Sequence, residues 1–372
     1  MKQIVFEEKK LVDCLPEILA DKKINKLLVV SNGPCMELDI VKEVAGLPIE
    51  IVWFEEFEPN PDYESVVKGV KVFRKSSCDA ILAIGGGSAM DVAKCIKLYA
   101  TMDEKENYLK QEPKDNSITL LAVPTTAGTG SEATRFAVIY YQGEKQSVAH
   151  TSIIPEYVFL YPEILKGLPD YQKKATSMDA LCHSMEAFWS VNSTGESRDY
   201  SKEAIALILK YLPEYLEGDM DAARKMLVAA NLAGRAINIT QTTAGHAMCY
   251  KLTSLFGIAH GHAAALCVAR LWPYMLEHIE NCLDTRGEIY LEQTFDELAR
   301  AFGCVTGKGA VEKFHEMLEH MGLFVLKDRA KGCFEEYLEK LVPSVNLTRL
   351  KNNPVQLDAE ALKKIYTEIL RG

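Results

Sequence analysis

Side chains of metal-ligand type gather in one stretch of the sequence, residues 177–265. Asp179 and His183 are four positions apart, so on a helix both project from one face. His246 follows, and His260 and His262 stand together in the segment AHGHAAAL. One carboxylate and several imidazoles suit a divalent transition metal. The residues alone predict a site for Fe(II), Zn(II), Mn(II) or Co(II) with Asp179, His183, His246 and either His260 or His262 as ligands.

The other four histidines are isolated in the sequence: His150, His278, His315 and His320. A lone histidine is more often a core or surface residue than a metal ligand, whereas clustered histidines point to a site. We therefore leave these four out of the predicted metal site.

The segment AILAIGGGSAMDVAKCIKL, residues 80–98, has the pattern of a strand, a glycine loop and a helix. Backbone amides at Gly86 and Gly87 can approach a phosphate closely, and the positive end of the helix favours a pyrophosphate. We expect Ser88 to cap this helix, with Asp91 as its capping-box partner. The dinucleotide fingerprint GxGxxG is absent, so a tight turn without a ligand is the alternative interpretation.

A second candidate loop, VPTTAGTGSEATRF, places four hydroxyls directly after a strand: Thr125, Thr126, Thr129 and Ser131. In a parallel sheet that position is the carboxyl end, where ligands bind. A polar connection without a ligand is the alternative. Asn60, in the proline-rich turn EPNPDYES, is expected to line the cofactor cleft.

Short apolar runs alternate with helical patterns in the first half, and long helical patterns follow from about residue 162. Strands are expected at residues 26–31, 49–54, 80–85, 118–123 and 156–161, with a hairpin from residue 136 to 152. Helices are expected at residues 35–45, 63–74, 88–100, 171–190, 197–216, 220–238, 260–278, 289–301 and 357–370. The order predicts an α/β domain with a mostly parallel sheet, residues 1–164, and an all-α domain, residues 165–372, with a cleft between them.

The composition is that of a globular protein, with 48% hydrophobic and 25% charged residues in 372. A net charge of -10 argues against nucleic acid or an anionic membrane as partner. No apolar run approaches the roughly 20 residues of a membrane span, and the charged first ten residues do not resemble a signal peptide. Ten cysteines without paired spacing indicate reduced thiols and a cytoplasmic protein.

Several of these motifs together resemble the iron-containing (group III) alcohol dehydrogenase family, over essentially the whole chain. The matching pieces are Asn60-Pro61, GGGSAMD, PTTAGTGSE, DALCH and the two downstream histidine motifs. The resemblance implies a dehydroquinate synthase-like architecture in which a nicotinamide meets a metal. It also implies Asp179, His183, His246 and His260 as ligands, since the last ligand of the family precedes a glycine.

The resemblance extends to the coenzyme. It implies a pyrophosphate loop at Gly86, Gly87 and Ser88, cofactor-facing hydroxyls at Thr125, Thr126 and Thr129, and Lys145 near the nicotinamide ribose. Many members that prefer NAD carry Asp where this chain has Asn32, and that Asp would repel a 2′-phosphate. The coenzyme is therefore expected to be NADH or NADPH, and Asn32 in place of Asp leaves a preference for NADPH open.

Within the family the chain looks most like the phosphonoacetaldehyde reductase branch. Arg135, Arg198 and Lys251 are the cations that this likeness implies for a phosphonate, and Phe136 is expected at the wall of the cleft with Trp189 and Phe256. Many members have a histidine where this chain has Tyr250. Tyr250 or His262 is therefore the expected proton relay.

The expected function is hydride transfer from NADH or NADPH to a small aldehyde held by Fe(II), or by Zn(II) or another divalent metal, in a homodimer. Three alternatives stay open. In the first, the enzyme is a general dehydrogenase whose substrates are uncharged short-chain alcohols and aldehydes. In the second, the protein is a lyase of the dehydroquinate synthase type, and in the third it binds metal without catalysis.

Overall fold

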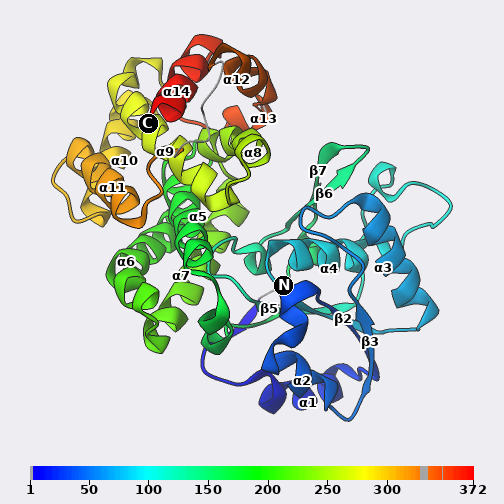
Figure 1. The fold of residues 1–372 in the computed structure, drawn as a ribbon. Helices are drawn as coiled ribbons and strands as arrows, with labels where there is room; N and C mark the ends of the chain where they lie inside the picture. The colour runs from blue at the N-terminus through cyan, green and yellow to red at the C-terminus, as the bar shows by residue number, and fades with distance from the viewer. Residues whose placement is uncertain (1–2, 327–333, 346) are drawn as a thin grey trace. The chain divides into compact units, whose positions relative to one another are not determined.

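The chain divides into two compact units, residues 1–167 and 168–372. The computed structural model describes residues 3–326, 334–345 and 347–372, and Figure 1 shows the ribbon. The sequence placed the division three residues earlier, at residue 164. Each unit has its own secondary-structure class, so the two are described separately.

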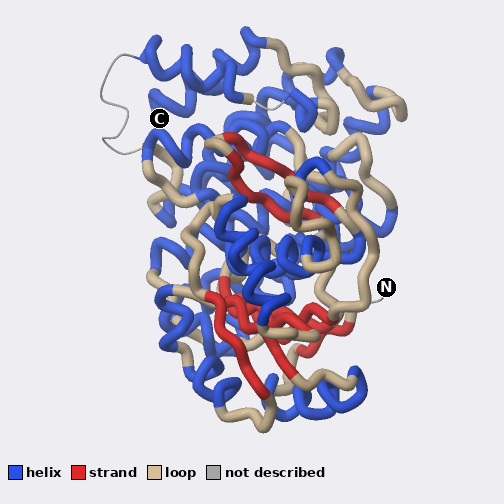
Figure 2. The backbone as a smooth tube through the Cα atoms, turned by 90° about the vertical axis from the view of Figure 1, so that its right-hand side faces the viewer, coloured by secondary structure: helices blue, strands red, loops and turns tan. Residues whose placement is uncertain are grey.

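The first unit is built on a six-stranded sheet in which every pairing is parallel. Figure 2 draws its strands in red. The strands are β1 (Ile4–Phe6), β2 (Lys26–Val30), β3 (Glu50–Phe54), β4 (Ala80–Gly85), β5 (Thr119–Pro124) and β8 (Tyr157–Phe159), in the order β1-β8-β5-β4-β2-β3. Every residue of β4 and β5 is buried, because helices cover both faces of a parallel sheet. β3 and β4 lie on opposite sides of β2, and the crevice at such a switch point is where open α/β sheets bind ligands.

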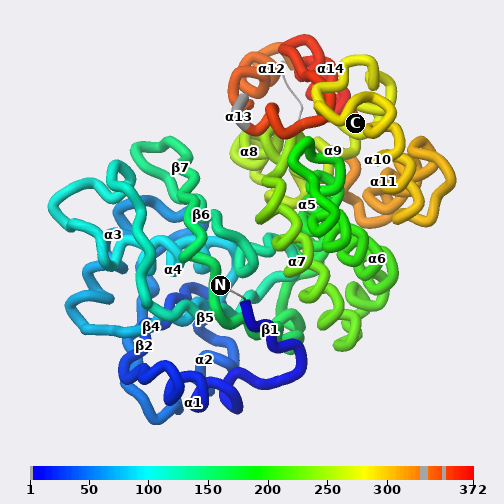
Figure 3. The backbone as a smooth tube through the Cα atoms, turned by 180° about the vertical axis from the view of Figure 1, so that it is seen from behind, coloured from blue at the N-terminus to red at the C-terminus, as the bar shows by residue number. Residues whose placement is uncertain are grey.

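Helices cover both faces of this sheet (Figures 1 and 3). On one face α1 (Leu11–Lys22) and α2 (Asp39–Ala45) pack through an apolar cluster that includes Leu15, Val29 and Leu82. On the other face are α3 (Tyr63–Lys75) and α4 (Gly87–Tyr99). The prediction of an α/β unit with a parallel sheet is therefore confirmed.

Two local features refine this part of the prediction. The expected hairpin is present as β6 (Phe136–Tyr141) and β7 (Glu144–Ala149), joined through Gln142 and Gly143, which both have positive φ. The expected helix over residues 35–45 is interrupted. A 3₁₀ turn (Gly33–Glu37) is separated from α2 because Leu38 is extended, with ψ of 142°.

The second unit is helical in its described residues. Its helices are α5 (Asp170–Trp189), α6 (Gly195–Glu217), α7 (Met220–Thr240), α8 (Ala244–Phe256), α9 (His260–Glu277), α10 (Glu288–Ala301), α11 (Gly307–Met321), α12 (Phe334–Leu341), α13 (Leu347–Leu350) and α14 (Ala359–Arg371). α6, α7 and α9 surround α5, which is why almost every residue from Ala175 to Trp189 is buried (Figure 3). The helical C-terminal half is confirmed, although the sequence patterns did not predict α8, α11, α12 and the short α13.

Among the described residues, no helix has both the length and the apolar content needed to cross a bilayer. The nine cysteines in the described part of the chain are all free thiols. Most are buried among apolar side chains, and burial raises the pKa of Cys95, Cys182 and Cys267. These thiols therefore stay protonated and fill the core.

Candidate metal and coenzyme sites

Helix α5 presents Asp179 and His183 from one face, and both side chains are buried. Helix α9 comes unusually close to this face at Gly261. A Cβ at that glycine would lie 2.0 Å from the Ala175 carbonyl oxygen and 2.7 Å from Asp179 Cβ. Only glycine allows this approach, and it places His260, the first residue of α9, beside the α5 carboxylate.

Three predicted ligands converge in the second unit. Asp179, His246 and His260 each offer a ligand atom, and these atoms lie within 4.8 Å of one another. His246 Nε2 is 3.3 Å from Asp179 Oδ1. The His183 ring stacks on the His246 ring with centroids 4.2 Å apart, so the fourth predicted ligand borders the same group.

Glu186, which the sequence reasoning missed, fixes the orientation of His246. Its Oε1 is 2.5 Å from His246 Nδ1 and accepts from the His246 backbone amide at 3.0 Å. Its Oε2 accepts from the backbone amide and the hydroxyl of Thr243, at 2.5 and 2.6 Å. In the neutral ring that a metal requires, Nδ1 donates to the Glu186 carboxylate, so the lone pair is at Nε2, toward Asp179. Glu186 lies seven residues after Asp179, two helical turns along the same face, and that spacing was the available signal.

The buried charges balance one another in this cluster. Burial alone would lower the pKa of His246, but the carboxylates of Glu186 and Asp179 outweigh it and raise that pKa to about 9. Burial would raise the pKa of Asp179, yet His183, His246 and His260 hold it well below its usual value. A deprotonated carboxylate and imidazoles oriented by a second carboxylate are the donor set of a divalent transition metal, so these residues fit the metal predicted from the sequence.

The two proposed proton donors have different surroundings. His262 Nδ1 is 3.0 Å from the Tyr171 hydroxyl, which also accepts from the Ala259 amide at 2.9 Å. The Tyr250 ring lies 5.1 Å from the His260 ring between centroids, and its hydroxyl accepts from Arg349 at 2.5 Å. Burial raises the pKa of Tyr250 against the opposing effect of Arg349, so the phenol is neutral at physiological pH.

The predicted substrate cations are differently placed. Arg198 donates to Tyr290 and Glu297 on α10, at 2.9 and 2.8 Å, and its guanidinium lies 4.6 Å from the Phe188 ring centroid. These contacts join α6 to α10, so they give Arg198 a structural role. Lys251 follows Tyr250 on α8 and is half-buried.

Most coenzyme candidates of the first unit follow the carboxyl ends of neighbouring parallel strands; Asp91, inside α4, and Lys145, on β7, do not. Asn32 follows β2, Asn60 follows β3, the glycine loop follows β4 and the threonine loop follows β5. The Asn60 amide donates to Ser88 Oγ at 3.3 Å, and Asn32 Nδ2 donates to the Phe57 carbonyl at 2.5 Å. The strand order therefore gathers these groups at one edge of the sheet, as dinucleotide binding requires.

The glycine and threonine loops lie against each other within this unit. A Cβ at Gly86 would lie 3.7 Å from Thr126 Cγ2, and one at Gly87 would lie 3.3 Å from Thr129 Cγ2. Glycine therefore leaves the first loop's backbone open beside the hydroxyls of the second. Backbone amides and hydroxyls together at the start of α4 form an arrangement that fits a pyrophosphate.

The predicted capping box at the start of α4 is wrong. The N-cap is Gly86, and no side chain caps it. Ser88 is already inside the helix because the turn begins two residues earlier than expected. Asp91 accepts instead from Ser131 Oγ at 3.1 Å and from the Val138 amide at 3.1 Å. Burial raises the pKa of Asp91 to about 6 despite the neighbouring ammonium of Lys94.

Lys94 is fully buried and organises the end of the threonine loop. Its ammonium donates to Ser131 Oγ and Thr134 Oγ1, each at 3.0 Å, and to the Phe136 carbonyl at 2.8 Å. Lys145 is on β7 opposite Tyr140, and its charge lowers the pKa of Asp91 as a minor effect. Arg135 stacks on Phe136, with the guanidinium carbon 5.0 Å from the ring centroid.

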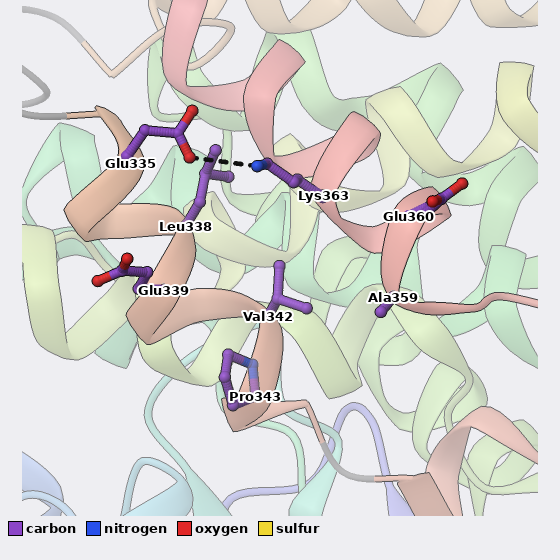
Figure 4. A pocket seen from close by; sticks show the side chains of 8 residues that line it. All are labelled: Glu335, Leu338, Glu339, Val342, Pro343, Ala359, Glu360 and Lys363. Carbon is purple, nitrogen blue, oxygen red and sulfur yellow. Dashed lines mark hydrogen bonds and ion pairs between the residues drawn. The ribbon is translucent and has the colours of Figure 1, made fainter.

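A separate hollow lies between α12 and α14 (Figure 4). It is lined by Glu335, Leu338, Glu339, Val342, Pro343, Ala359, Glu360 and Lys363. Glu335 and Lys363 form an ion pair across it at 3.2 Å. Its exposed carboxylates and aliphatic walls do not provide the converging donors found near Asp179.

Comparisons with known proteins agree with both halves of this description. The model of the family described as iron-containing alcohol dehydrogenase matches residues 2–162, and that of the Fe-containing alcohol dehydrogenase family, C-terminal, matches residues 173–370. Phosphonoacetaldehyde reductase of Streptomyces viridochromogenes is 32% identical over 323 residues, which are 82% of this chain and 80% of that protein.

Two further relatives show how far the likeness extends. Aldehyde-alcohol dehydrogenase 2 of Entamoeba histolytica is 31% identical over 85% of this chain, and the match spans only 39% of that protein. The crystal structure of sulfoacetaldehyde reductase from Bifidobacterium kashiwanohense in complex with NAD+ has a TM-score of 0.87 and 26% identity, and the match covers 99% of this chain and 97% of that one.

Proposed function

Because the chain belongs to the iron-containing alcohol dehydrogenase family, we propose that it reduces a short aldehyde with NADH or NADPH at a metal held by Asp179, His183, His246 and His260. The observation that carries this proposal is the buried Asp179, His246 and His260 cluster with Glu186 behind it. A finer proposal is that the aldehyde carries a phosphonate, as in phosphonoacetaldehyde, and yields 2-hydroxyethylphosphonate. The 32% identity to a phosphonoacetaldehyde reductase supports it.

The bound groups supply the chemistry: a divalent metal polarises the carbonyl as a Lewis acid, and the reduced nicotinamide carries the hydride. The chain's own residues orient these groups. Glu186 keeps His246 Nε2 directed toward Asp179. Gly86, Gly87, Ser88, Thr126 and Thr129 are proposed to hold the pyrophosphate, as their packing at the start of α4 supports.

The remaining coenzyme assignments are proposals carried by position. Asn32, Asn60, Thr125 and Ser131 follow the strand ends, while Asp91 acts indirectly by fixing Ser131. Lys145 is proposed to contact the nicotinamide ribose. The Asn32 side chain carries no charge that would repel a 2′-phosphate, which supports the use of NADPH.

Two groups are proposed as proton donors to the nascent alkoxide, Tyr250 and His262. His262 is hydrogen-bonded to Tyr171, a residue that is 40% exposed, so His262 is connected to solvent through Tyr171. Replacing each in turn, as Tyr250→Phe and His262→Ala, separates them. The variant that loses turnover while keeping metal content identifies the donor.

The experiment is a steady-state panel with NADH and NADPH after reconstitution with Fe(II) or Zn(II). Phosphonoacetaldehyde, sulfoacetaldehyde, acetaldehyde and propionaldehyde are compared. Oxidation of either coenzyme, lost in a folded His260→Ala variant of measured metal content, is the expected result. If no aldehyde oxidises either coenzyme, the reductase proposal fails and a lyase that recycles its coenzyme becomes the better interpretation.

We also propose a cytoplasmic homodimer. The free thiols of the described residues support a reducing compartment. Light scattering coupled to size-exclusion chromatography measures the mass in solution. A mass near twice the 41.5 kDa of one chain is expected, and a monomer would contradict the assembly.

A further inference from the structure

Helix α4 carries a fully buried lysine, Lys94, whose contacts all reach the threonine loop and the start of β6. The ammonium donates to Ser131 Oγ and Thr134 Oγ1 at 3.0 Å each, to the Phe136 carbonyl at 2.8 Å, and to the Ser131 carbonyl. These oxygens offset the cost of burying the charge only while residues 131–136 keep this conformation. Lys94 therefore favours one conformation of the end of the threonine loop.

The Ser131 hydroxyl is held between two charges of the same helix. Ser131 Oγ donates to Asp91 Oδ1 at 3.1 Å and accepts from Lys94 Nζ at 3.0 Å. Asp91 and Lys94 are three residues apart on α4, so both project from one face. Burial lowers the pKa of Lys94 to about 8, against the opposing effect of the Asp91 carboxylate, so the ammonium is charged at pH 7. The pair fixes both the position and the orientation of the hydroxyl.

The Ser131 backbone passes this constraint on to Thr129. The Ser131 amide donates to Thr129 Oγ1 at 3.2 Å, and a Cβ at Gly87 would lie 3.3 Å from Thr129 Cγ2. Ser131 is buried, whereas Thr129 and Gly87 are half-buried. Because the Thr129 oxygen accepts from the Ser131 amide, its own proton points away from that amide and can donate to a phosphate oxygen. A continuous series of contacts thus leads from Lys94 to the proposed pyrophosphate site.

We propose that Lys94 is a positioning residue for the coenzyme, which sets the affinity for the pyrophosphate by holding the threonine loop through Ser131. This inference rests on the proposed function, because it assumes that NADH or NADPH binds at the glycine and threonine loops. Lys94 acts through the loop, since its side chain is fully buried and its ammonium is surrounded by loop oxygens. A loop that is already ordered loses less conformational entropy when a ligand binds, so the affinity is higher.

The same helix supplies a matched control, the second buried lysine Lys97. Its ammonium donates to the Ile118 carbonyl at 2.6 Å and is 3.7 Å from Glu156 Oε1. Ile118 directly precedes β5 and Glu156 directly precedes β8, so these contacts lie at the amino ends of the strands. The glycine and threonine loops follow the carboxyl ends. Replacing Lys97 therefore removes a buried ammonium from α4 at the opposite edge of the sheet.

The experiment measures coenzyme affinity at pH 7 in the metal-loaded wild type and in Lys94→Met, Thr134→Val and Lys97→Met. Methionine keeps most of the lysine volume without the ammonium, and valine keeps the shape of threonine without the hydroxyl that accepts from Lys94. Isothermal titration calorimetry gives the Kd of NADH, NADPH and ADP-ribose, and ADP-ribose contains the pyrophosphate but no nicotinamide. Urea unfolding measures the stability of each variant, and steady-state kinetics separates kcat from the KM of the coenzyme.

The expected result is a loss of coenzyme affinity that does not follow stability. Lys94→Met should raise the Kd of all three ligands roughly 10-fold, by the same factor for each, because they share the pyrophosphate. The KM of the coenzyme should rise with it, while kcat at saturating coenzyme stays within about threefold. Lys97→Met should leave every Kd within about twofold, whatever its effect on the urea midpoint. Thr134→Val should weaken binding a few-fold and add little to Lys94→Met, because both changes break one contact.

Four outcomes would overturn the inference. They are unchanged Kd values in a folded Lys94→Met protein, equal losses in Lys94→Met and Lys97→Met, a loss for NADH without a loss for ADP-ribose, and fully additive losses in Lys94→Met and Thr134→Val. If Lys94→Met does not fold, Thr134→Val decides alone, and a Kd equal to that of Lys97→Met overturns the inference. In each case the wild type binds the coenzyme and the proposed function stands, whereas a wild type that binds neither NADH nor NADPH removes the proposed function itself.

Discussion

Replacing Glu186 by Gln tests whether this carboxylate sets the ligand state of His246. In the wild type, each Glu186 oxygen accepts two hydrogen bonds: Oε1 from the His246 amide and Nδ1, and Oε2 from the amide and hydroxyl of Thr243. A glutamine has one oxygen and one NH₂ group in those places. Whichever way it is oriented, its NH₂ faces a backbone N–H donor, and no solvent reaches the fully buried position.

The two orientations have different costs. With the NH₂ toward Thr243, the buried Thr243 amide loses its acceptor, which costs about 1–3 kcal/mol of stability. With the NH₂ toward His246, Nδ1 must become the acceptor, and the ring proton moves to Nε2, the atom 3.3 Å from Asp179. That proton blocks coordination. Loss of such an orienting partner typically costs 10- to 100-fold in metal affinity, or about 1.4–2.8 kcal/mol.

The assay is a chelator-competition titration with Zn(II) or Fe(II), combined with the melting temperature of the metal-free protein. Glu297→Gln is the matched control, since Glu297 is a carboxylate that pairs with Arg198 and Lys202 on α6. NADPH-induced thermal stabilisation reports independently that the first unit is folded. A Glu186→Gln protein that is folded and binds metal within twofold of the wild type would refute the role assigned to Glu186.

Three further changes probe both units. Gly261→Ala puts a methyl group 2.0 Å from the Ala175 carbonyl oxygen, so α9 must move away from α5. We expect a stability loss of at least about 2 kcal/mol in urea unfolding and weaker metal binding in metal analysis. An unchanged urea midpoint would contradict the close approach of the two helices. Asn32→Asp adds a negative charge after β2 and should lower kcat/KM for NADPH at least about 10-fold more than for NADH. Equal effects on the two coenzymes would show that Asn32 does not face the 2′ position of the coenzyme's ribose. The pKa of Asp91 is raised to about 6 in the folded chain, so its stabilising contribution is present below about pH 4 and is lost as the pH rises through 6. Relative to Asp91→Asn, the wild type should lose about 3 kcal/mol of stability across that window, and parallel pH profiles would disprove the shift.

Local patterns predicted the sheet and the ligand helix well, because their signals lie within short windows. Buried parallel strands appear as continuous apolar runs, as at β4 and β5. The four-residue spacing of Asp179 and His183 needs only one helix to place both side chains on one face. The family followed from motif order, and the comparisons confirmed it.

Contacts between distant segments were beyond the sequence. Glu186 carried a helical-face signal, but its partners on α8 are about 60 residues away, so their approach depends on helix packing. Arg349 lies outside every motif, and its position beside Tyr250 is fixed by loop contacts. The capping prediction for Ser88 failed because the strand and the glycine turn, not the helical pattern, decide where α4 begins. The roles of the site residues remain predictions.

The hydrogen bonds that Glu186, on α5, accepts from the start of α8 link metal occupancy to local opening of α8. The same carboxylate that orients His246 is the acceptor for the Thr243 and His246 amides. Opening the first turn of α8 therefore breaks the contact with Glu186 that keeps His246 Nε2 available as a ligand. A metal that binds only when this turn is closed must favour the closed state by mass action. Amide hydrogen exchange at Thr243 and His246 should accordingly slow as the metal concentration rises. Two backbone protons in a helix cap would then record, without any turnover, how much of the protein carries its metal.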